Sequence, residues 1–224
     1  SYSDLMPPLP EAIERALADG DLRGLDLRAL CFRGRDLSNA QLDGARLDGA
    51  DLRDVSLDHA NLSGASLASA RLQGAHLTAT DLTEADLSDA VFDGATLVRA
   101  VLRRTIMPRA RFRDSSWTEV VAQAGDWTTV DLRGARFERV DFQDLDARGA
   151  RFDGAWFKDS DLARMDVQGC GATGVRVIDS TLEDTEFDGG DLSGAEVRFA
   201  NCDRVSFRGA DLSASQWESV AFRG

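Results

Sequence analysis

The chain of 224 residues has little positive charge. Its 26 Lys and Arg residues stand against 39 Asp and Glu, a formal net charge of −13, and Lys158 is the single lysine. This balance excludes general nucleic-acid binding as the main activity, because phosphate contacts need an excess of positive charge. No apolar stretch reaches the ~20 residues of a membrane span, and no signal segment opens the sequence. We therefore expect a cytoplasmic protein without a membrane partner.

Residues with metal-binding or nucleophilic chemistry are also scarce. Cys31, Cys170 and Cys202 are far apart and include no CxxC pair, which excludes a disulfide framework and a thiolate zinc site. The two histidines, His59 and His76, are expected on the surface, and no phosphate loop, HExxH or GxSxG motif is present. We predict no catalytic residues, no cofactor and no metal, and hence a protein that is not an enzyme.

A period of five residues dominates the sequence. From Leu22 to Phe222, all 41 residues whose numbers end in 2 or 7 are apolar, and 20 of them are Leu and ten are Phe. Two places earlier the residue is usually small, with Ala at 18 of the 41 places, and the other three places are mainly polar. A period of five fits neither a helix nor a strand. It predicts a coil that turns a corner every five residues, with one large and one small side chain inside.

The pattern A-[D/N]-L-x-x, seen at residues 50–52, 60–62, 85–87 and 210–212, resembles that of the pentapeptide-repeat family. Over residues 22–222 the resemblance implies an all-β fold, a right-handed quadrilateral β-helix with twenty residues per coil and about ten coils. At ~4.8 Å per strand such a rod is roughly 50 Å long.

Positions twenty residues apart in such a coil share one column of the core. Ala122 falls beside Trp117 and Trp127, so we predict that large and small core residues compensate in volume. Cys170 and Cys202 fall at core positions, and Cys31 points outward. With all core positions filled, we expect no deep pocket.

The two ends of the coil differ. Residues 1–20 are expected to be an N-terminal segment with a capping helix, begun near Pro10 and ended by Gly20, and residues 21–224 the β-helix. The C-terminal coil shows no such cap. We expect a second copy to cover it in an end-to-end homodimer, the alternative being a further domain of a longer protein. The apolar stripe of the cap is Leu9, Ala12, Ile13, Ala16 and Leu17, and the dimer end is Trp217, Val220 and Phe222.

Twenty residues per coil also place negative charge on one side. In four coils between residues 121 and 200, the first two repeats hold ten acids and two bases, whereas the other two repeats, on the opposite side, hold seven of each. We expect this side to bind a cationic protein surface rather than a divalent metal; the alternative is a mere preference of the repeat for Asp. The acidic strip is Asp126, Asp141, Asp144, Asp146, Asp161, Asp166, Glu183, Asp184, Glu186 and Asp188, of which residues 126, 146, 166 and 186 should form a carboxylate ladder.

Two further features interrupt the pattern. Residues 99–113 contain six arginines and no acid, a basic belt that either docks a partner or neutralises the middle of the rod. Trp156 points outward between Arg136 and Arg176 at twenty-residue intervals, which predicts a cation–π ladder ending at Glu196. The basic belt is Arg99, Arg103, Arg104, Arg109, Arg111 and Arg113.

Two functions remain open. The first is a rigid scaffold for protein–protein interaction. The second comes from the resemblance: one branch of the family resembles B-form DNA, binds type II topoisomerases such as DNA gyrase and confers quinolone resistance. Duplex DNA carries one negative charge per ~1.7 Å of its helix axis. Along the axis of the rod, the whole chain carries about one net negative charge per 4 Å, and the acidic strip carries about one per 2.4 Å. The sequence also lacks that branch's C-terminal dimerising helix and inserted loop, so we favour the scaffold.

Overall fold

Each pentapeptide forms one side of a coil because it ends in a tight turn. In the repeat around Leu42, the amide of Ala45 donates a hydrogen bond to the carbonyl oxygen of Leu42 at 2.9 Å, and Gly44 has a φ of 65°. A left-handed residue at the third place of a β-turn normally favours glycine. Here many other residues adopt it at the equivalent place, including Asp144 and Arg164 with φ of 59°. Stacking of neighbouring coils holds these residues in that conformation.

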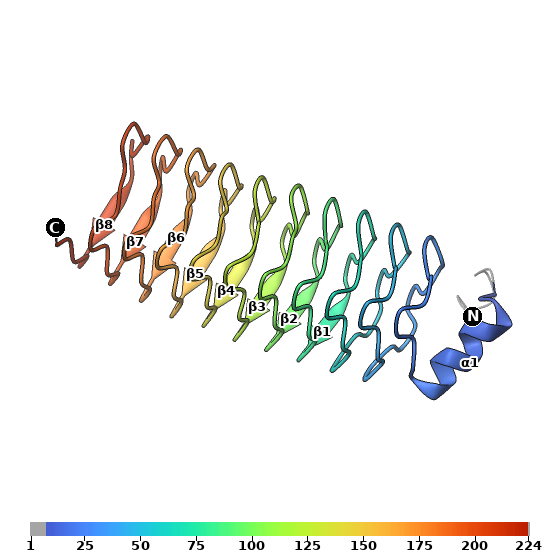
Figure 1. Cartoon of the computed structure of the whole chain (residues 1–224). Coiled ribbons are helices and arrows are strands. Elements are labelled where there is room, and N and C mark those ends of the chain that lie inside the picture. The colour runs from blue at the N-terminus through green and yellow to red at the C-terminus, as the bar shows by residue number, and fades with distance from the viewer. Residues whose placement is uncertain (1–7, 224) are drawn as a thin grey trace.

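The coils stack with a register of twenty residues. The structure is a computed structural model that describes residues 8–223, so the first seven residues of the predicted N-terminal segment and Gly224 lie outside the described residues. Parallel strands form one eight-stranded sheet, and successive strands along the chain are neighbours in it (Figure 1). The strands are β1 (His76–Thr78), β2 (Thr96–Val98), β3 (Ser116–Thr118), β4 (Arg136–Glu138), β5 (Trp156–Lys158), β6 (Arg176–Ile178), β7 (Glu196–Arg198) and β8 (Gln216–Glu218).

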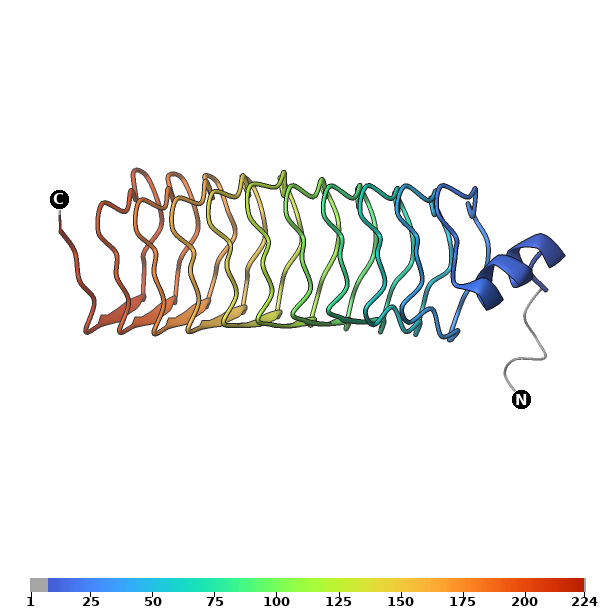
Figure 2. The same ribbon diagram turned by 60° about the horizontal axis from the view of Figure 1, so that its bottom comes forward.

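Single β-bridges continue this register beyond the strands, from Asp21 with Gln41 to Asn201 with Ala221. The turns of the chain lie side by side along one axis, with the helix at one end and the last coil at the other (Figure 2). The predicted fold class, a parallel β-solenoid with one short helix, is confirmed. Regular strands define only about seven turns, fewer than the ten predicted, because elsewhere single bridges join neighbouring turns.

The interior of the coil is apolar, as the period of five predicts. From Leu22 to Cys202 all the residues at numbers ending in 2 or 7 are buried except Phe187, which is half-buried. Aromatic rings fill the middle of the rod: the Trp117 and Trp127 ring centroids are 5.7 Å apart, on either side of the small Ala122 in sequence. The predicted volume compensation therefore holds at this place.

The two core cysteines are buried as predicted, and desolvation raises the pKa of the Cys170 and Cys202 thiols to about 12. Cys31 lies on an outward, half-exposed place. Burial of this kind makes Cys170 and Cys202 packing residues, because a thiol with a raised pKa is a poor nucleophile near neutral pH.

The helix α1 (Glu11–Asp19) covers the first coil. Gly20 ends it with a φ of 70°, as predicted, whereas Pro10 lies just before the helix, at its N-cap. Leu9, Ile13, Ala16 and Leu17 pack against the core, but Ala12 is exposed, so its place in the predicted stripe is wrong. Ala12 is the second residue of the helix, and its side chain faces solvent because α1 contacts the coil along only a narrow face. An ion pair of 2.7 Å between Glu14 and Arg35 ties α1 to the coil and holds the pKa of Glu14 below its usual range.

Candidate protein-interaction surfaces

The acids of the strip occupy defined columns along the rod. Asp126, Asp146, Asp166 and Glu186 are joined in sequence by parallel bridges, so these four residues stack one coil above the next. A parallel bridge also joins Asp141 and Asp161, in the column five residues earlier in each coil. Carboxylates at this ~4.8 Å repeat repel one another unless a cation lies between them.

Arginines neutralise about half of the strip. Arg148 bonds Asp146 at 2.7 Å and lies 3.6 Å from Asp166, while Arg164 bonds Asp144 at 2.7 Å. Hydrogen bonds from these guanidinium groups lower the pKa of Asp144 and Asp146. The count of bases within the strip did not include Arg204, which lies in the next coil. Arg204 bonds both Glu183 and Asp184.

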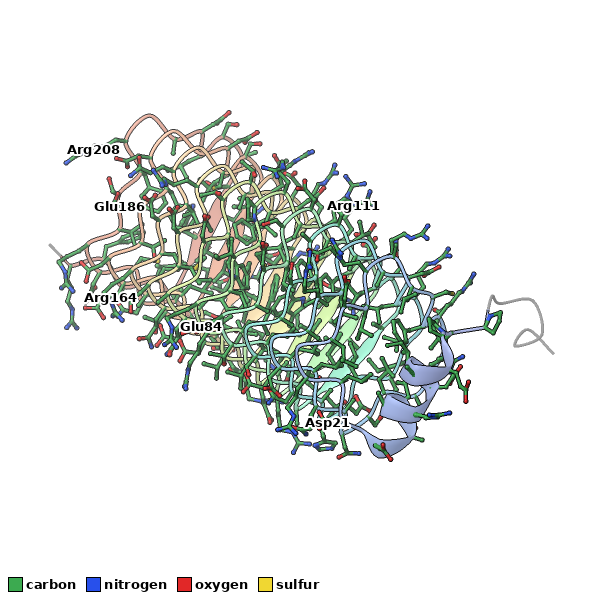
Figure 3. All side chains as sticks on the ribbon, turned by 45° about the vertical axis from the view of Figure 1, so that its right-hand side comes forward. Asp21, Glu84, Arg111, Arg164, Glu186 and Arg208 are labelled. Atoms are coloured by element: carbon green, nitrogen blue, oxygen red, sulfur yellow. The ribbon has the colours of Figure 1, made fainter. Side chains whose placement is uncertain are left out.

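Arg164 and Glu84 belong to one column of alternating sign. In Figure 3 both residues lie along the same edge of the rod, whereas Arg111 lies on the other edge. Arg104 bonds Glu84 across one coil at 2.6 Å, as Arg164 bonds Asp144 and Arg204 bonds Asp184. This column is therefore charge-balanced, and the excess negative charge of the strip lies in the columns beside it.

Five acids of the strip have no ion pair with any residue that the structure describes. Their carboxylates accept hydrogen bonds only from neutral or backbone donors: the Gln123 amide reaches Asp141 at 2.5 Å, and the Gln168 amide reaches Glu186 at 2.6 Å. These donors orient the carboxylates without cancelling their charge. Counting charges in the sequence missed these glutamines, because each one bonds an acid eighteen residues away, in the next coil. The five are Asp126, Asp141, Asp161, Glu186 and Asp188.

The basic belt is largely neutralised by acids of adjacent coils. Arg109 bonds Asp89 at 2.6 Å, Arg111 bonds Asp93, and Arg113 bonds Asp131 at 2.7 Å. With Arg104 paired to Glu84, only Arg99 and Arg103 of the belt lack an ion pair within residues 8–223. The acids that pair with the basic belt lie in neighbouring coils, outside residues 99–113, so the sequence of the belt itself contains no acid.

Asp131 connects the belt to the next coil. Burial raises the pKa of this carboxyl, but hydrogen bonds from Arg133 and Arg113 outweigh burial and hold the pKa well below its ordinary value. Ile106 is 46% exposed beside the belt, at an outward place where most repeats carry a polar residue. The belt thus presents one exposed apolar residue and two free guanidinium groups rather than six.

Trp156 lies in register with Arg136 on one side and Arg176 on the other, in strands β4 to β6. The Arg176 guanidinium is 3.4 Å from Glu196, the predicted end of the ladder. Within the described part of the chain, however, no guanidinium makes a cation–π contact with the Trp156 ring, so that part of the prediction is wrong. Long arginine side chains turn away to solvent and to acids, and the space that they leave beside the indole is a groove.

The last coil leaves apolar side chains uncovered. Phe222 is 57% exposed and Leu212 is 37% exposed, while Trp217 and Val220 are half-buried. Trp217 packs between Phe207 and Phe222, with ring centroids 5.3 and 5.9 Å apart. The predicted dimer end is therefore an apolar surface, in contrast to the end that α1 covers.

Other sites for chemistry are few. His59 and His76 are exposed, and within residues 8–223 no group of three His, Cys, Asp or Glu side chains is arranged to hold a metal ion. No helix of the described chain has the length and apolar composition needed to cross a membrane. In the C-terminal half of the core an apolar cavity of about 40 Å³ lies among Phe152, Met165 and Trp217, much smaller than a ligand pocket. Small core residues such as Val167 and Ala172 leave this space.

Comparisons with known proteins agree with the fold. A family model described as pentapeptide repeats matches eight copies, over residues 21–58, 36–74, 60–97, 70–109, 129–164 and 178–214. No curated protein matches the sequence. HetL, a pentapeptide repeat protein involved in heterocyst differentiation regulation in the cyanobacterium Nostoc sp. strain PCC 7120, is similar in structure. Its TM-score is 0.68 at 22% identity, covering 94% of this chain and 95% of HetL.

Two other solved structures match with lower scores. The plasmid-mediated fluoroquinolone resistance protein QnrB1 has a TM-score of 0.37 at 18% identity, covering 88% of this chain and 89% of its own. A pentapeptide repeat protein of the Arabidopsis thaliana thylakoid lumen has a TM-score of 0.23 at 24% identity, covering 58% and 79%. At these identities the likeness concerns the fold alone.

Proposed function

Because the chain belongs to the pentapeptide-repeat family, we propose that it is a non-enzymatic, rigid scaffold whose acidic strip binds an arginine- or lysine-rich protein surface. The observation that carries this proposal is the set of five strip carboxylates without an ion pair, in three columns of stacked coils. Gyrase belongs to the second candidate function below; nucleic acid is not expected to be the main partner.

The rod holds the carboxylate ladder in place without the help of a partner. In the ladder, the Trp127 amide donates to the Asp146 carbonyl oxygen at 2.7 Å and the Ala147 amide donates to that of Asp166 at 2.8 Å, so each rung is fixed by backbone hydrogen bonds. A surface that is already ordered loses little conformational entropy on binding. Stacked like charges are also mildly destabilising, and a cationic partner would relieve that repulsion.

The second candidate is a DNA mimic that binds type II topoisomerases, and the carboxylate ladder is the observation that favours it. With Arg204 counted, the strip has seven more acids than bases over about 19 Å, or about one charge per 2.7 Å. Duplex DNA has one per ~1.7 Å. The strip is thus less densely charged than the duplex that it would imitate, which supports the scaffold ahead of the mimic.

A titration of DNA gyrase supercoiling separates the two candidates. We expect supercoiling to be unchanged at micromolar concentrations of the protein, with and without a quinolone. Inhibition of supercoiling, or protection against the quinolone, that is lost on reversing Asp146 and Asp166 to arginine would establish the mimic instead. An acidic protein without a repeat structure serves as the control for non-specific charge effects.

We also propose that the C-terminal coil joins a second copy end to end. The exposed apolar residues of this coil and its unpaired backbone edge form a surface that a two-fold mate can cover, whereas α1 already covers the other end. Each copy would present the same residues to the other, as a closed dimer requires.

Light scattering tests the dimer. We expect a mass of twice the 24.3 kDa of one chain, falling to one chain when Phe222 is replaced by glutamate, because the charge would be buried without a partner. As a control, Ala124→Glu changes an exposed residue in the middle of the rod and should leave the mass unchanged. A mass of one chain for the wild-type protein at tens of micromolar would contradict the proposal.

A further inference from the structure

A groove of about 480 Å³ runs along the charge-balanced side of the rod, away from the acidic strip. It crosses three coils and is lined by Gly134, Arg136, Gly154, Trp156, Gly174 and Arg176. Its volume is in the range of sites that take small organic ligands. The arginines and the tryptophan begin strands β4, β5 and β6, so neighbouring side chains along the groove are one strand spacing apart, ~4.8 Å.

Trp156 breaks the pattern of its own column. The equivalent outward places in other coils hold only polar residues, from Asp36 and Ser56 to Glu196 and Gln216. An indole at such a place is half-exposed to water, yet it makes no ring contact with another aromatic residue among those that the structure describes. Nothing in the packing of the coil requires it. A large exposed aromatic residue at a position that is otherwise polar, and that contributes nothing to packing, indicates a functional site.

The floor of the groove is open for a separate reason. The left-handed turn position does not demand glycine here, because Asp54 and Asp114 adopt the same conformation in the same column with φ of 58° and 55°. Around Trp156 the place holds glycine, as it does in most coils. A Cβ at Gly154 or Gly174 would meet no atom within 4 Å, whereas one at Gly134 would lie too close to Asp114 Oδ1. Gly154 and Gly174 therefore leave space at the foot of the indole, and Gly134 avoids a clash with Asp114.

The walls carry positive charge that the protein does not neutralise. The Arg136 side chain makes no ion pair or hydrogen bond with any residue between 8 and 223. Arg176 has one carboxylate neighbour, Glu196, which also bonds Arg198 at 2.8 Å. Two guanidinium groups thus flank one indole, and at least one has all its donors free.

From this geometry we propose that the groove binds a small planar aromatic anion of the nucleotide class. The base stacks on the Trp156 ring, and the phosphate oxygens accept hydrogen bonds from Arg136 or Arg176. Guanidinium groups bind phosphate in a bidentate manner, and aromatic side chains are stacking platforms for any base. The glycine floor lets the ribose approach the backbone.

The charge of the rest of the chain limits the size of the ligand. A nucleic-acid strand would extend past the groove over a protein of net charge −13, where its phosphates are repelled. A single nucleotide keeps its charge within about one Debye length of the two arginines, ~8 Å at physiological salt. The site therefore favours a free nucleotide over a strand.

Calorimetric titration of the whole chain with ADP tests the site, with adenosine and pyrophosphate as separate probes. We expect ADP to bind, and adenosine and pyrophosphate each to bind at least about tenfold more weakly, because each keeps only one of the two contacts. Trp156→Gln and the double variant Arg136→Gln, Arg176→Gln should each weaken ADP binding about tenfold. Glutamine occupies the equivalent place at Gln216, so the coil accepts it.

Arg139→Gln is the matched control, because it removes an exposed arginine of the same coil outside the groove and should leave ADP binding unchanged. Absence of ADP binding up to millimolar concentration would overturn the proposal. So would ADP binding that survives Trp156→Gln, pyrophosphate binding as tight as that of ADP, or binding of an acidic aromatic peptide in place of ADP. Far-UV circular dichroism of each variant shows that the coil is intact.

Discussion

Replacement of Trp127 with alanine is expected to lower the free energy of unfolding by about 3–5 kcal/mol, the cost of removing a large buried aromatic side chain. Trp127 is completely buried, its ring centroid is 5.0 Å from that of Phe142, and its indole N–H donates to the Thr105 hydroxyl at 3.1 Å. Ala122 and Gly125 beside it are too small to fill the space. Urea unfolding followed by circular dichroism measures the loss.

Trp156→Gln provides the matched comparison, because it removes an indole from the outer side of the coil. Its effect on the free energy of unfolding should stay within about 0.5 kcal/mol. A loss below about 1 kcal/mol for Trp127→Ala would contradict the account of the core, since the neighbouring coils would then have collapsed into the vacated space.

The coil and its core could be predicted from the sequence because the period is unbroken. Every residue from Leu22 onward has a place fixed by its number, and backbone hydrogen bonds between coils enforce that place. Burial of Cys202 and the left-handed turns follow from position alone. Ala12 was misplaced because it lies in α1, outside the periodic region, where a stripe of apolar residues does not say how much of the helix touches the coil.

The electrostatics of the surface could be predicted only in part. Columns of charge follow from the period, but the acid that an arginine reaches depends on its side-chain conformation. Arg148 stays within its own repeat and bonds Asp146, two residues away, whereas Arg204 reaches back twenty residues to Asp184. The same freedom explains the missing cation–π contact at Trp156, since Arg176 turns toward Glu196.

The cavity in the C-terminal half could not be predicted for a related reason. Small residues such as Val167 and Ala172 are visible in the sequence, but whether larger neighbours move in to fill the space depends on three-dimensional packing. The aromatic cluster around Trp127 fills its part of the coil, and the region near Met165 does not.

Reversal of Asp146 and Asp166 to arginine is expected to abolish binding of the partner of the acidic strip and to leave the fold intact. Two charges of the wrong sign would stand in the middle of the carboxylate ladder, beside Asp126 and Glu186, and like-charge contacts with a cationic partner cost several kcal/mol. The coil accepts arginine there, because Arg46 occupies the same column in an earlier coil. The result is a loss of affinity of at least about tenfold.

A control with the same change of charge separates the strip from net charge alone. Asp159 and Asp179 are exposed, lie on the opposite side of the rod and are also spaced by twenty residues. Arginine occupies their column at Arg139, with a φ of 55°, so Asp159→Arg and Asp179→Arg fit the same left-handed backbone. This double variant has the net charge of the strip variant and should bind the partner as the wild-type protein does.

Quantitative capture from a lysate of the source organism compares the three proteins most directly. The immobilised wild-type rod and the Asp159→Arg, Asp179→Arg control should retain the same proteins with arginine- or lysine-rich surfaces, and the Asp146→Arg, Asp166→Arg variant should retain at least about tenfold less of them. Equal retention by all three rods, or equal loss from both variants, would contradict the claim that the acidic strip is the binding surface of this scaffold.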